Sequence, residues 1–357
     1  MPMYTPGRSI DSVAREVGIS DIVKLASNES LWGPSERVLE AARKSLDGLN
    51  RYPEMRPRDL VNALADHSGF SGEHILVGNG ADELLRLVAM AYVSPGDRVL
   101  YPTPSFSAYS YGARLMGGEE VPVPLNTDGQ ADLQAMVDRA DDHTSLIYLC
   151  NPNNPTGGIF RQKEWDVFLG GVANRTLVVV DQAYREFVDD PAYARIEDDI
   201  RQGAPVVMVR TFSKLYGLAG TRVGWLAAAP EIVRVLERVR DPFSVNVVGI
   251  AAAIEALRDQ TYVNGVRQET LRLRQWLREM LLQRGYRVLE SQANFLTFDA
   301  KMDPLTLAQR LEQLGVIVRP TTSFGLAGHC RVTIAPRALL ERFLEALDRV
   351  VLESHHV

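Results

Sequence analysis

The stretch from Thr211 to Trp225 places an amine among groups that bind anions. Lys214 follows an apolar, strand-like run, and Thr211, Ser213 and Arg222 lie close to it in the chain. An amine held in a fixed position can attack a carbonyl and form a Schiff base. Two hydroxyls and a guanidinium suit a phosphate monoester. The stretch therefore predicts a pyridoxal phosphate site, while a surface lysine followed by a glycine turn is the simpler alternative.

A second candidate lies at the end of an apolar run at residues 177–181, where the last residue is Asp181 and Tyr184 follows three positions later. A carboxylate at the end of a buried strand is costly unless it meets a cation or several donors. A protonated pyridine nitrogen is such a cation, and its protonation makes the ring an electron sink. A helix N-cap role for Asp181 and a core position for Tyr184 are the alternatives.

Two glycines and a helix start form a third candidate, in GNGADE at residues 78–83. The backbone N–H groups of Ala81, Asp82 and Glu83 would lack partners in the first turn of the helix, so they could bind a phosphate. Asp82 could instead simply cap that helix.

Two further loops follow predicted strands. In PTPSFSAY, Phe106 could stack on a flat cofactor ring, although an aromatic residue beside a strand end is also typical of a core. NPNNPTG, at residues 151–157, is rigid, and its amides can donate toward the carboxyl edge of a sheet, where α/β proteins bind ligands. A plain turn would not need so many prolines and asparagines, so the composition of this loop favours a binding role.

An α/β fold must position these loops. From about residue 75 to 228, seven short apolar runs alternate with helix-length amphipathic segments. This pattern predicts a mostly parallel sheet covered on both faces by helices. Beyond Pro242 we expect an apolar helix, a polar helix at about 268–284, two strands and two more helices, which together predict a smaller α+β domain. The expected division is an N-terminal arm at 1–34 packing with the small domain, a large domain at 35–245 and a small domain at 246–357.

The amino-acid composition indicates which kinds of binding partner and which cellular compartment to expect. The chain has 357 residues, of which 46% are hydrophobic and 24% charged, and its net charge of -6 includes no long block of one sign. We therefore expect neither nucleic acid nor a membrane as a partner. The N-terminal stretch lacks the apolar run of a signal peptide. Two distant cysteines, Cys150 and Cys330, are too few for a disulfide framework or a metal site and fit a cytoplasmic protein.

Taken in order, these stretches resemble the motifs of one enzyme family. GNGADE, PTPSFSAY, NPNNPTG, VVVDQAY, TFSKLYGLAGTRVG and RVTIA are similar to those of the pyridoxal phosphate-dependent aminotransferases of the aspartate aminotransferase fold, fold type I, class II. The match is closest to the histidinol-phosphate aminotransferases and covers nearly the whole chain. The resemblance implies a seven-stranded, mostly parallel sheet, a small-molecule amino donor and keto acceptor, and a homodimer with shared active sites.

The resemblance also implies roles for the cofactor-binding residues. Lys214 matches the lysine that bonds to the cofactor and later moves a proton to or from the substrate carbon. Asp181 matches the partner of the pyridine nitrogen, and Asn154 and Tyr184 match the groups that bind the ring oxygen. Phe106 matches the stacking aromatic. The phosphate is expected to be held by Ala81, Asp82, Thr211, Ser213 and Arg222, and by Tyr52 of a second subunit.

Substrate-binding residues are implied in the same way. Arg331 matches the arginine that binds a substrate carboxylate through a bidentate pair. Arg319 and Tyr4 match residues that help to hold a substrate phosphate, and Asn28 lies on a loop expected beside the substrate. A surface ion pair for Arg331, and a place along a domain seam for Arg319 and Tyr4, are the alternatives.

Departures from the family pattern bear on the substrate. They are Ser30, Leu31 and Trp32 in a loop near the substrate, Met55 and Arg56 after RYPE, and Ala335 where glycine is common. The expected reaction transfers an amino group between histidinol phosphate and 2-oxoglutarate in histidine biosynthesis. Because Trp32 could reshape the pocket, an aromatic amino acid aminotransferase is the alternative, followed by a threonine-phosphate decarboxylase and a catalytically silent binding protein.

Overall fold

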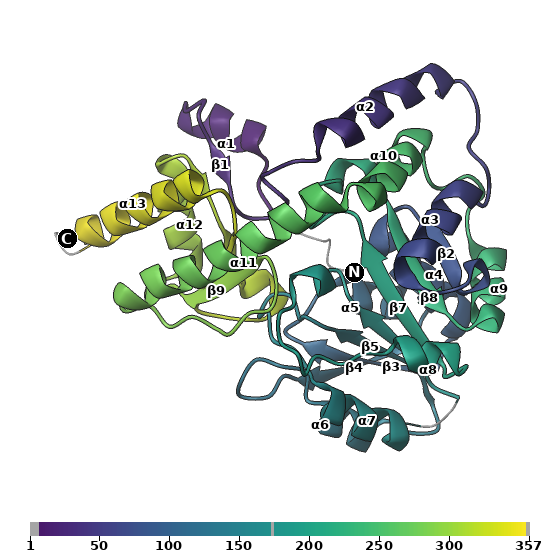
Figure 1. Cartoon of the computed structure of the whole chain (residues 1–357). Coiled ribbons are helices and arrows are strands. Elements are labelled where there is room, and N and C mark those ends of the chain that lie inside the picture. Colours follow the sequence, from purple (N-terminus) through teal and green to yellow (C-terminus); the bar gives the residue numbers. More distant parts are fainter. Residues whose placement is uncertain (1–6, 173–174, 355–357) are drawn as a thin grey trace.

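The computed structural model describes residues 7–172 and 175–354 of the chain. A larger α/β part and a smaller part that contains the C-terminal helix lie side by side (Figure 1). The long helix α11 (Gln260–Gln283) extends from one part to the other. Val263 of α11 packs in the core of the large part and Leu277 in that of the small part, so this helix joins the two cores.

A seven-stranded sheet forms the large part, which confirms the predicted fold class. The strand order is β2-β8-β7-β6-β5-β3-β4; β8 pairs antiparallel with β2 and β7, and the other neighbouring strands pair in parallel. Each strand coincides with one of the seven apolar runs. The strands are β2 (Ile75–Gly78), β3 (Arg98–Thr103), β4 (Glu119–Pro124), β5 (Thr144–Cys150), β6 (Leu177–Asp181), β7 (Val206–Thr211) and β8 (Gly224–Ala228).

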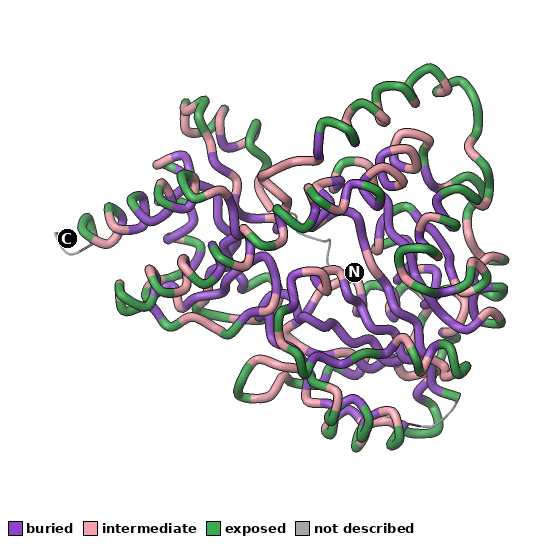
Figure 2. Tube along the Cα trace, viewed as in Figure 1, coloured by how far each residue is buried: buried purple, intermediate pink, exposed green. Residues whose placement is uncertain are grey.

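Alternate residues of the central strands pack in two apolar cores, one on each face of the sheet. Val178 and Val180 of β6 belong to one core, and Val179 between them belongs to the other, which explains why β6 is apolar throughout. Figure 2 shows the buried strands between helices that are exposed on their outer sides. The helices of this part are α2 (Glu36–Ser45), α3 (Arg58–Ser68), α4 (Gly80–Tyr92), α5 (Ala108–Leu115), α6 (Leu133–Arg139), α7 (Gln162–Gly171), α8 (Glu197–Arg201), α9 (Pro230–Val239) and α10 (Val247–Arg258).

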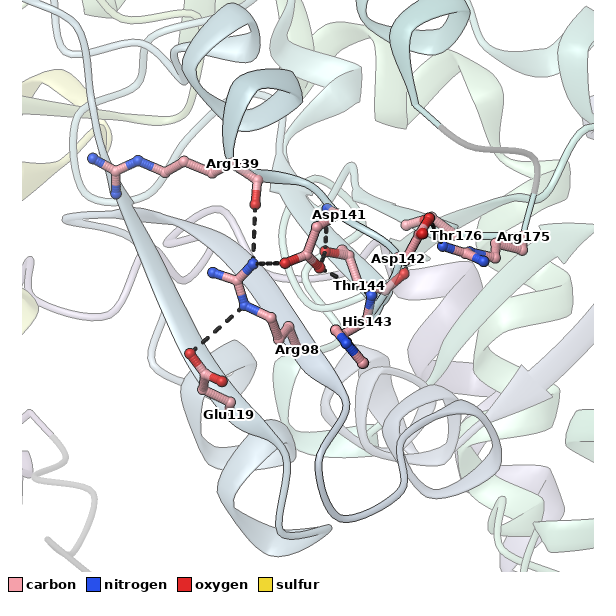
Figure 3. A network of polar contacts seen from close by, with 9 residues as sticks. All are labelled: Arg98, Glu119, Arg139, Asp141, Asp142, His143, Thr144, Arg175 and Thr176. Carbon is pink, nitrogen blue, oxygen red and sulfur yellow. Dashed lines mark hydrogen bonds and ion pairs between the residues drawn. The ribbon is translucent and has the colours of Figure 1, made fainter.

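Ion pairs lie at the amino ends of the strands (Figure 3). Arg98 at the start of β3 pairs with Asp141 and, at 3.6 Å, with Glu119, while Arg175 just before β6 pairs with Asp142. These side chains are partly or fully exposed, so each pair adds little to stability. The charged network covers one edge of the sheet and leaves the opposite, carboxyl edge to the loops that are predicted to bind ligands.

Two short sheets form the small part. Strand β12 (His329–Thr333) lies between β9 (Phe295–Asp299) and β11 (Arg319–Pro320), antiparallel to both. In the other sheet, β1 (Val23–Lys24) of the N-terminal arm pairs in parallel with β10 (Val316–Ile317), so the arm packs on the small part. The remaining helices are α1 (Ile10–Val17), α12 (Pro304–Gln313), α13 (Arg337–Ser354) and the 3-10 helices η1 (Leu46–Gly48), η2 (Gly72–His74), η3 (Arg185–Phe187), η4 (Ala219–Thr221) and η5 (Thr322–Phe324).

The change from one core to the other falls within α11. Helix α10 still packs in the core of the large part, through Ala252 and Ala256. The domain boundary that we expect after residue 245 therefore lies earlier in the chain than the point where the helices begin to pack in the small core. Helix α11 also begins at Gln260, earlier than the expected 268. Its start is fixed by Asp259, whose side chain accepts a hydrogen bond from the Tyr262 N–H at 3.4 Å.

No helix within residues 7–172 and 175–354 has the length and apolar character needed to cross a membrane. In the same part of the chain, no cluster of His, Cys, Asp and Glu side chains has a geometry that could hold a metal ion. Cys150 and Cys330 are both buried as free thiols.

Candidate active site

A cavity of about 330 Å³ lies at the carboxyl edge of the large sheet and is lined by residues of both parts. The loops that follow β2, β3, β5, β6 and β7 meet there, as expected for a ligand site in an α/β protein. The predicted residues that line it are Asn28, Ala81, Asp82, Phe106, Asn154, Asp181, Tyr184, Thr211, Ser213, Lys214, Arg222, Arg319 and Arg331. Three predicted residues are missing from this lining: Glu83 and Tyr52 lie elsewhere, and Tyr4 falls outside the described residues.

Lys214 lies just after β7, with its amine inside the cavity. Its Nζ donates a hydrogen bond to the Ser27 carbonyl at 3.1 Å and lies 5.7 Å from the centre of the Tyr184 ring. Burial, helped by the positive charge of Arg331, lowers the pKa of Lys214 to about 8. The neutral amine is therefore accessible near neutral pH, as a nucleophile or a proton acceptor requires.

Asp181 ends β6 and is buried, with 3% of its surface exposed. It accepts hydrogen bonds from the Tyr109 hydroxyl at 2.9 Å and from the Ala183 N–H at 3.0 Å. Burial raises the pKa of Asp181 to about 6, against the lowering effect of the Tyr109 hydrogen bond. The N-cap alternative is wrong, because η3 begins at Arg185 and its N-cap is Tyr184. A cation in the cavity would offset the cost of burying this carboxylate.

Tyr109 is a contributor that the sequence analysis missed. It is fully buried, stacks on Tyr148 with ring centres 5.0 Å apart, and donates to Asp181. The signal in the sequence that could have identified Tyr109 was its position three residues after Phe106, on the side of α5 that faces the sheet. Phe106 itself lines the cavity and meets the Tyr109 ring edge-on at 6.0 Å.

Tyr184 and Asn154 connect the large part to the small part. The Tyr184 hydroxyl accepts a hydrogen bond from Asn28 Nδ2 at 3.0 Å, and burial raises its pKa. Asn154 accepts a hydrogen bond from Arg331. The core alternative for Tyr184 holds in part, because its ring also packs edge-on against Phe295 at 5.2 Å. These side chains thus connect the predicted cofactor site with the predicted substrate site.

The predicted phosphate site is a concave cradle, in which closely approaching backbone segments lie beside side chains that can donate hydrogen bonds. A Cβ at Gly224 would lie 2.6 Å from the Ala81 nitrogen, and Gly80 has a φ of 76°, which side-chain-bearing residues rarely adopt, so both positions favour glycine. Arg222 adopts a left-handed φ of 55°, which is uncommon for a residue with a side chain. The Thr211 and Ser213 hydroxyls lie 2.9 Å apart beside it.

Asp82 does not cap α4, because the N-cap is Asn79. Its carboxylate pairs instead with Arg222 at 2.9 Å. Glu83 points away from the cavity, and its carboxylate accepts hydrogen bonds from the Asn79 N–H and, at 3.1 Å, from the Ser244 hydroxyl. Glu83 therefore supports the phosphate loop from behind, and only its backbone is left as a candidate for contact with a ligand.

Two arginines define the other end of the cavity. Arg319 of β11 and Arg331 of β12 are direct partners in the register of the antiparallel pair. Both guanidiniums lie over the Phe324 ring, at 5.3 Å and 5.2 Å, and Arg331 also donates to the Ala26 carbonyl at 2.8 Å. Like charges opposite one another on neighbouring strands are unfavourable. A bound anion would relieve that repulsion, so this end of the cavity is suited to a phosphate or a carboxylate.

The residues present fit pyridoxal phosphate. The glycine-lined cradle and the donors Thr211, Ser213 and Arg222 match a phosphate monoester, and the buried carboxylate of Asp181 suits a protonated pyridine nitrogen. Lys214 offers an amine with a lowered pKa in the same cavity. Three chemically distinct requirements of the cofactor are thus met around one space.

Comparison with known proteins agrees with this chemistry. The sequence profile of the aminotransferase class I and II family matches residues 20–347. The histidinol-phosphate aminotransferase of Symbiobacterium thermophilum is 43% identical over 355 residues, which cover 99% of this chain and 97% of that protein. That of Moorella thermoacetica is 40% identical over 349 residues, or 98% of this chain and 90% of that protein.

Solved structures are similar along almost the whole chain. The histidinol-phosphate aminotransferase from Sinorhizobium meliloti, in complex with pyridoxal-5'-phosphate, has a TM-score of 0.88 and 29% identity, covering 98% of this chain and 96% of that chain. The aspartate aminotransferase from Thermus thermophilus with maleate shares the fold, with a TM-score of 0.84 and 23% identity over 98% of this chain and 100% of that chain.

Proposed function

Because this chain belongs to the class I and II aminotransferase family, we propose that it transfers an amino group between histidinol phosphate and 2-oxoglutarate in histidine biosynthesis, with pyridoxal 5'-phosphate as its cofactor. One observation carries the choice of substrate, which is that Arg319 and Arg331 lie opposite one another at the cavity containing Lys214. Paired guanidiniums can hold a phosphate or a carboxylate. Histidinol phosphate carries the first group and 2-oxoglutarate the second, so the same end of the cavity can seat both in turn.

Pyridoxal phosphate, when bound, supplies a carbonyl for the exchange of amino groups and a ring that accepts electrons from the substrate. Lys214 Nζ, with its lowered pKa, is the nucleophile and the base that moves a proton at the substrate carbon. With the cofactor bound, Asp181 would hold the proton on the ring nitrogen, and Tyr184 and Asn154 would bind the ring oxygen. Their contacts with Asn28 and Arg331 keep both side chains in place.

Trp32, the reason for considering an aromatic amino acid substrate, does not line the described cavity. Its side chain packs against both apolar cores, and its carbonyl accepts a hydrogen bond from Tyr262 at 3.2 Å. Leu31 packs on the small core. Residues 30–32 therefore give no support to a pocket built for an aromatic side chain, and histidinol phosphate is the favoured donor.

The substrate assignment is tested by measuring kcat/KM for histidinol phosphate and phenylalanine, each with 2-oxoglutarate, and carbon dioxide release from threonine phosphate. We expect histidinol phosphate to exceed phenylalanine by at least about 10²-fold, since a phosphate carries more charge and accepts more hydrogen bonds from the two arginines than the single carboxylate of phenylalanine. Turnover of either alternative without turnover of histidinol phosphate would refute the assignment.

Replacing Arg319 by glutamine is expected to raise KM for histidinol phosphate by about 10- to 100-fold, which corresponds to one lost charged hydrogen bond. A smaller effect on kcat is expected, because Arg319 lies at the phosphate end of the cavity and away from Lys214. Steady-state kinetics measure both. Arg195→Gln is the matched control, since Arg195 is an exposed arginine outside the cavity lining. Equal effects of the two substitutions would contradict the role of Arg319.

Loading of the cofactor is expected to depend on pH. Burial lowers the pKa of Lys214 to about 8, so the fraction of neutral amine rises as the pH increases toward and through that value. The rate at which added pyridoxal phosphate bonds to the cofactor-free protein should rise in the same range and then level off. Stopped-flow absorbance measures this rate. A rate that is flat or falls across this range would show that the protonation state of Lys214 does not limit loading.

A patch of exposed apolar side chains supports a homodimer. Leu46, Leu49, Tyr52 and Met55 are exposed by 49%, 62%, 84% and 58%, and all four lie within ten residues of the chain. A clustered apolar patch of this kind marks an interaction site. We propose that residues 46–55 contact a second copy of the chain and that Tyr52, which lies outside its own cavity lining, reaches the partner's phosphate site.

A Leu49→Asp substitution is expected to dissociate the dimer, because a carboxylate would be buried without a partner in the apolar contact. Light scattering should give about twice 39.6 kDa for the unmodified protein and 39.6 kDa for the variant. Leu305→Asp is the control, since Leu305 is 55% exposed on α12 of the small part. A monomeric unmodified protein, or a dimeric Leu49→Asp variant, would refute the proposed contact.

We also propose a cytoplasmic location. Both cysteines are buried free thiols, which fits a reducing compartment, and histidine biosynthesis uses soluble small molecules. Cell fractionation with an antibody against the chain tests this, and recovery outside the cytoplasmic fraction would contradict it.

A further inference from the structure

We infer that Phe243 is a positioning residue that holds Tyr52 for the partner's phosphate site, an inference that rests on the proposed role of Tyr52 in the homodimer. The two rings stack with their centres 4.9 Å apart and their planes 23° from parallel. Tyr52 is 84% exposed and Phe243 38% exposed. Two aromatic residues therefore meet on the surface, where neither contributes to a described core.

The backbone at Phe243 indicates that this contact is imposed. Phe243 has a φ of 59°, in the left-handed region that bulky residues rarely adopt. Such a conformation is retained only when the surrounding structure enforces it, and it is found preferentially at functional sites. Phe243 lies in the turn at residues 240–246, which connects α9 to α10.

Hydrogen bonds attach this turn to both loops of the phosphate site in the same subunit. On one side, the Ser244 hydroxyl donates to Glu83 at 3.1 Å, and Glu83 also accepts from the Asn79 N–H at the start of α4. On the other side, Asn246 Nδ2 donates to the Thr221 carbonyl at 2.8 Å, next to Arg222. The turn is therefore attached to both loops of the predicted phosphate site, which we call the phosphate cup.

The segment that carries Tyr52 is attached to the same turn. Arg240 donates one hydrogen bond to the Val77 carbonyl at 3.1 Å and another to the Met55 carbonyl, three residues after Tyr52. The backbone of the segment is thereby anchored to the end of β2, and the Phe243 ring restrains the Tyr52 side chain. In a two-fold symmetric dimer each phosphate cup would then be completed by a tyrosine already ordered on the partner.

Ordering the side chain in advance should strengthen cofactor binding. A freely rotating Tyr52 would lose its rotational freedom on reaching the phosphate, at a cost of about 0.5–1.5 kcal/mol, or about two- to tenfold in affinity. The stack with Phe243 removes part of that cost before the cofactor arrives. Phe243 thus acts on the phosphate only through Tyr52.

The test compares Phe243→Leu with Phe243→Tyr in the cofactor-loaded protein. Both keep a side chain at the left-handed position, but only tyrosine keeps a flat ring for the stack. Equilibrium dialysis, followed by the visible absorbance of the cofactor, gives its dissociation constant without any substrate. We expect Phe243→Leu to raise this constant about two- to tenfold and Phe243→Tyr to leave it unchanged. Light scattering and thermal unfolding of each variant show whether dimer and fold persist.

A double-variant cycle with Tyr52→Phe separates positioning from general support. If Phe243 acts through Tyr52, adding Phe243→Leu to Tyr52→Phe should weaken cofactor binding by less than Phe243→Leu alone. Independent, multiplying effects would overturn the inference, and so would unchanged cofactor binding by Phe243→Leu or a loss that occurs only with dissociation of the dimer. Because no substrate is used, a wrong assignment of histidinol phosphate would leave this result intact.

Discussion

A Lys214→Ala variant is expected to lose amino transfer by at least about 10⁴-fold, because it lacks both the nucleophile and the base at the reacting carbon. Lys214 is the one amine that lines the described cavity. The phosphate cup and Asp181 are unchanged in the variant, so it should still bind pyridoxal phosphate without a covalent bond. Initial rates with histidinol phosphate and 2-oxoglutarate measure the loss, and absorbance measures the binding.

Lys163→Ala is the control for this experiment, since Lys163 is an exposed lysine on α7 outside the cavity lining. It should retain full activity. A Lys214→Ala variant that keeps more than about 1% of the activity would mean that another group provides the nucleophile and the base, because general-base catalysis alone contributes about 10²–10⁴-fold.

The second large effect is expected for Asp181→Asn, with a loss of about 10²–10³-fold in kcat, comparable to removal of one preorganised electrostatic group. A neutral amide has no negative charge to hold a proton on the pyridine nitrogen. Tyr109 and the Ala183 N–H donate to different oxygens of Asp181, so the amide oxygen can keep the Ala183 bond while the Tyr109 hydroxyl turns to accept from the amide N–H. Single-turnover rates with histidinol phosphate isolate this chemical step.

In the cofactor-free protein, the Asp181→Asn substitution should maintain or increase stability, although it lowers kcat in the loaded enzyme. The pKa of Asp181 is raised to about 6 by burial, so the ionised carboxylate opposes folding; this penalty develops as the pH rises from about 4, the pKa of an unfolded aspartate, to about 6, and it is fully present above that pH. Asp181→Asn should therefore unfold at the same or a higher temperature than the unmodified protein above that pH, with a gain of up to about 2–3 kcal/mol. The difference should vanish as the pH falls below about 4, where the carboxyl group is protonated in both states.

Asp138→Asn removes an exposed carboxylate on α6 and serves as the control for both measurements. It should change neither kcat nor the pH dependence of unfolding. Strong destabilisation of the cofactor-free Asp181→Asn variant would contradict the proposed role of Asp181, because it would make Asp181 a structural residue instead of a charge held for a ligand.

The sheet was predictable because its strands are buried on both faces. A strand such as β6 must be apolar at each position when Val178 and Val179 pack in different cores, and that leaves a clear pattern in the sequence. The polar residue that ends such a strand is then conspicuous, which is why Asp181 could be singled out. Lys214 follows β7 and Gly80 follows β2 in the same way.

The small part was less predictable because its elements are short and its contacts distant in sequence. β10 and β11 have two residues each, so no periodicity identifies them. Only the register of β11 with β12 places Arg319 opposite Arg331, and nothing local encodes that pairing. Phe324, which lies under both guanidiniums, belongs to a 3-10 turn with no pattern of its own.

Glu83 illustrates the limit of reasoning from a motif. Its place in GNGADE predicted that its backbone N–H could bind the phosphate, but the motif did not indicate the role of its side chain, which accepts hydrogen bonds from Asn79 and from Ser244, 161 positions further along the chain. A side chain in the first turn of a helix can face either the ligand or the supporting structure, and the helix start alone does not decide between them. The long-range partner decides it, and that partner is visible only in the fold.

The most direct test of the central claim is the absorbance spectrum of the cofactor-loaded protein before and after histidinol phosphate is added without any keto acid. We expect the visible band of the bound cofactor to disappear as the amino group is transferred, and 2-oxoglutarate then to restore it. A visible band that ignores histidinol phosphate but responds to phenylalanine would contradict the substrate assignment. A protein that acquires no band on incubation with pyridoxal phosphate would contradict the site built around Lys214.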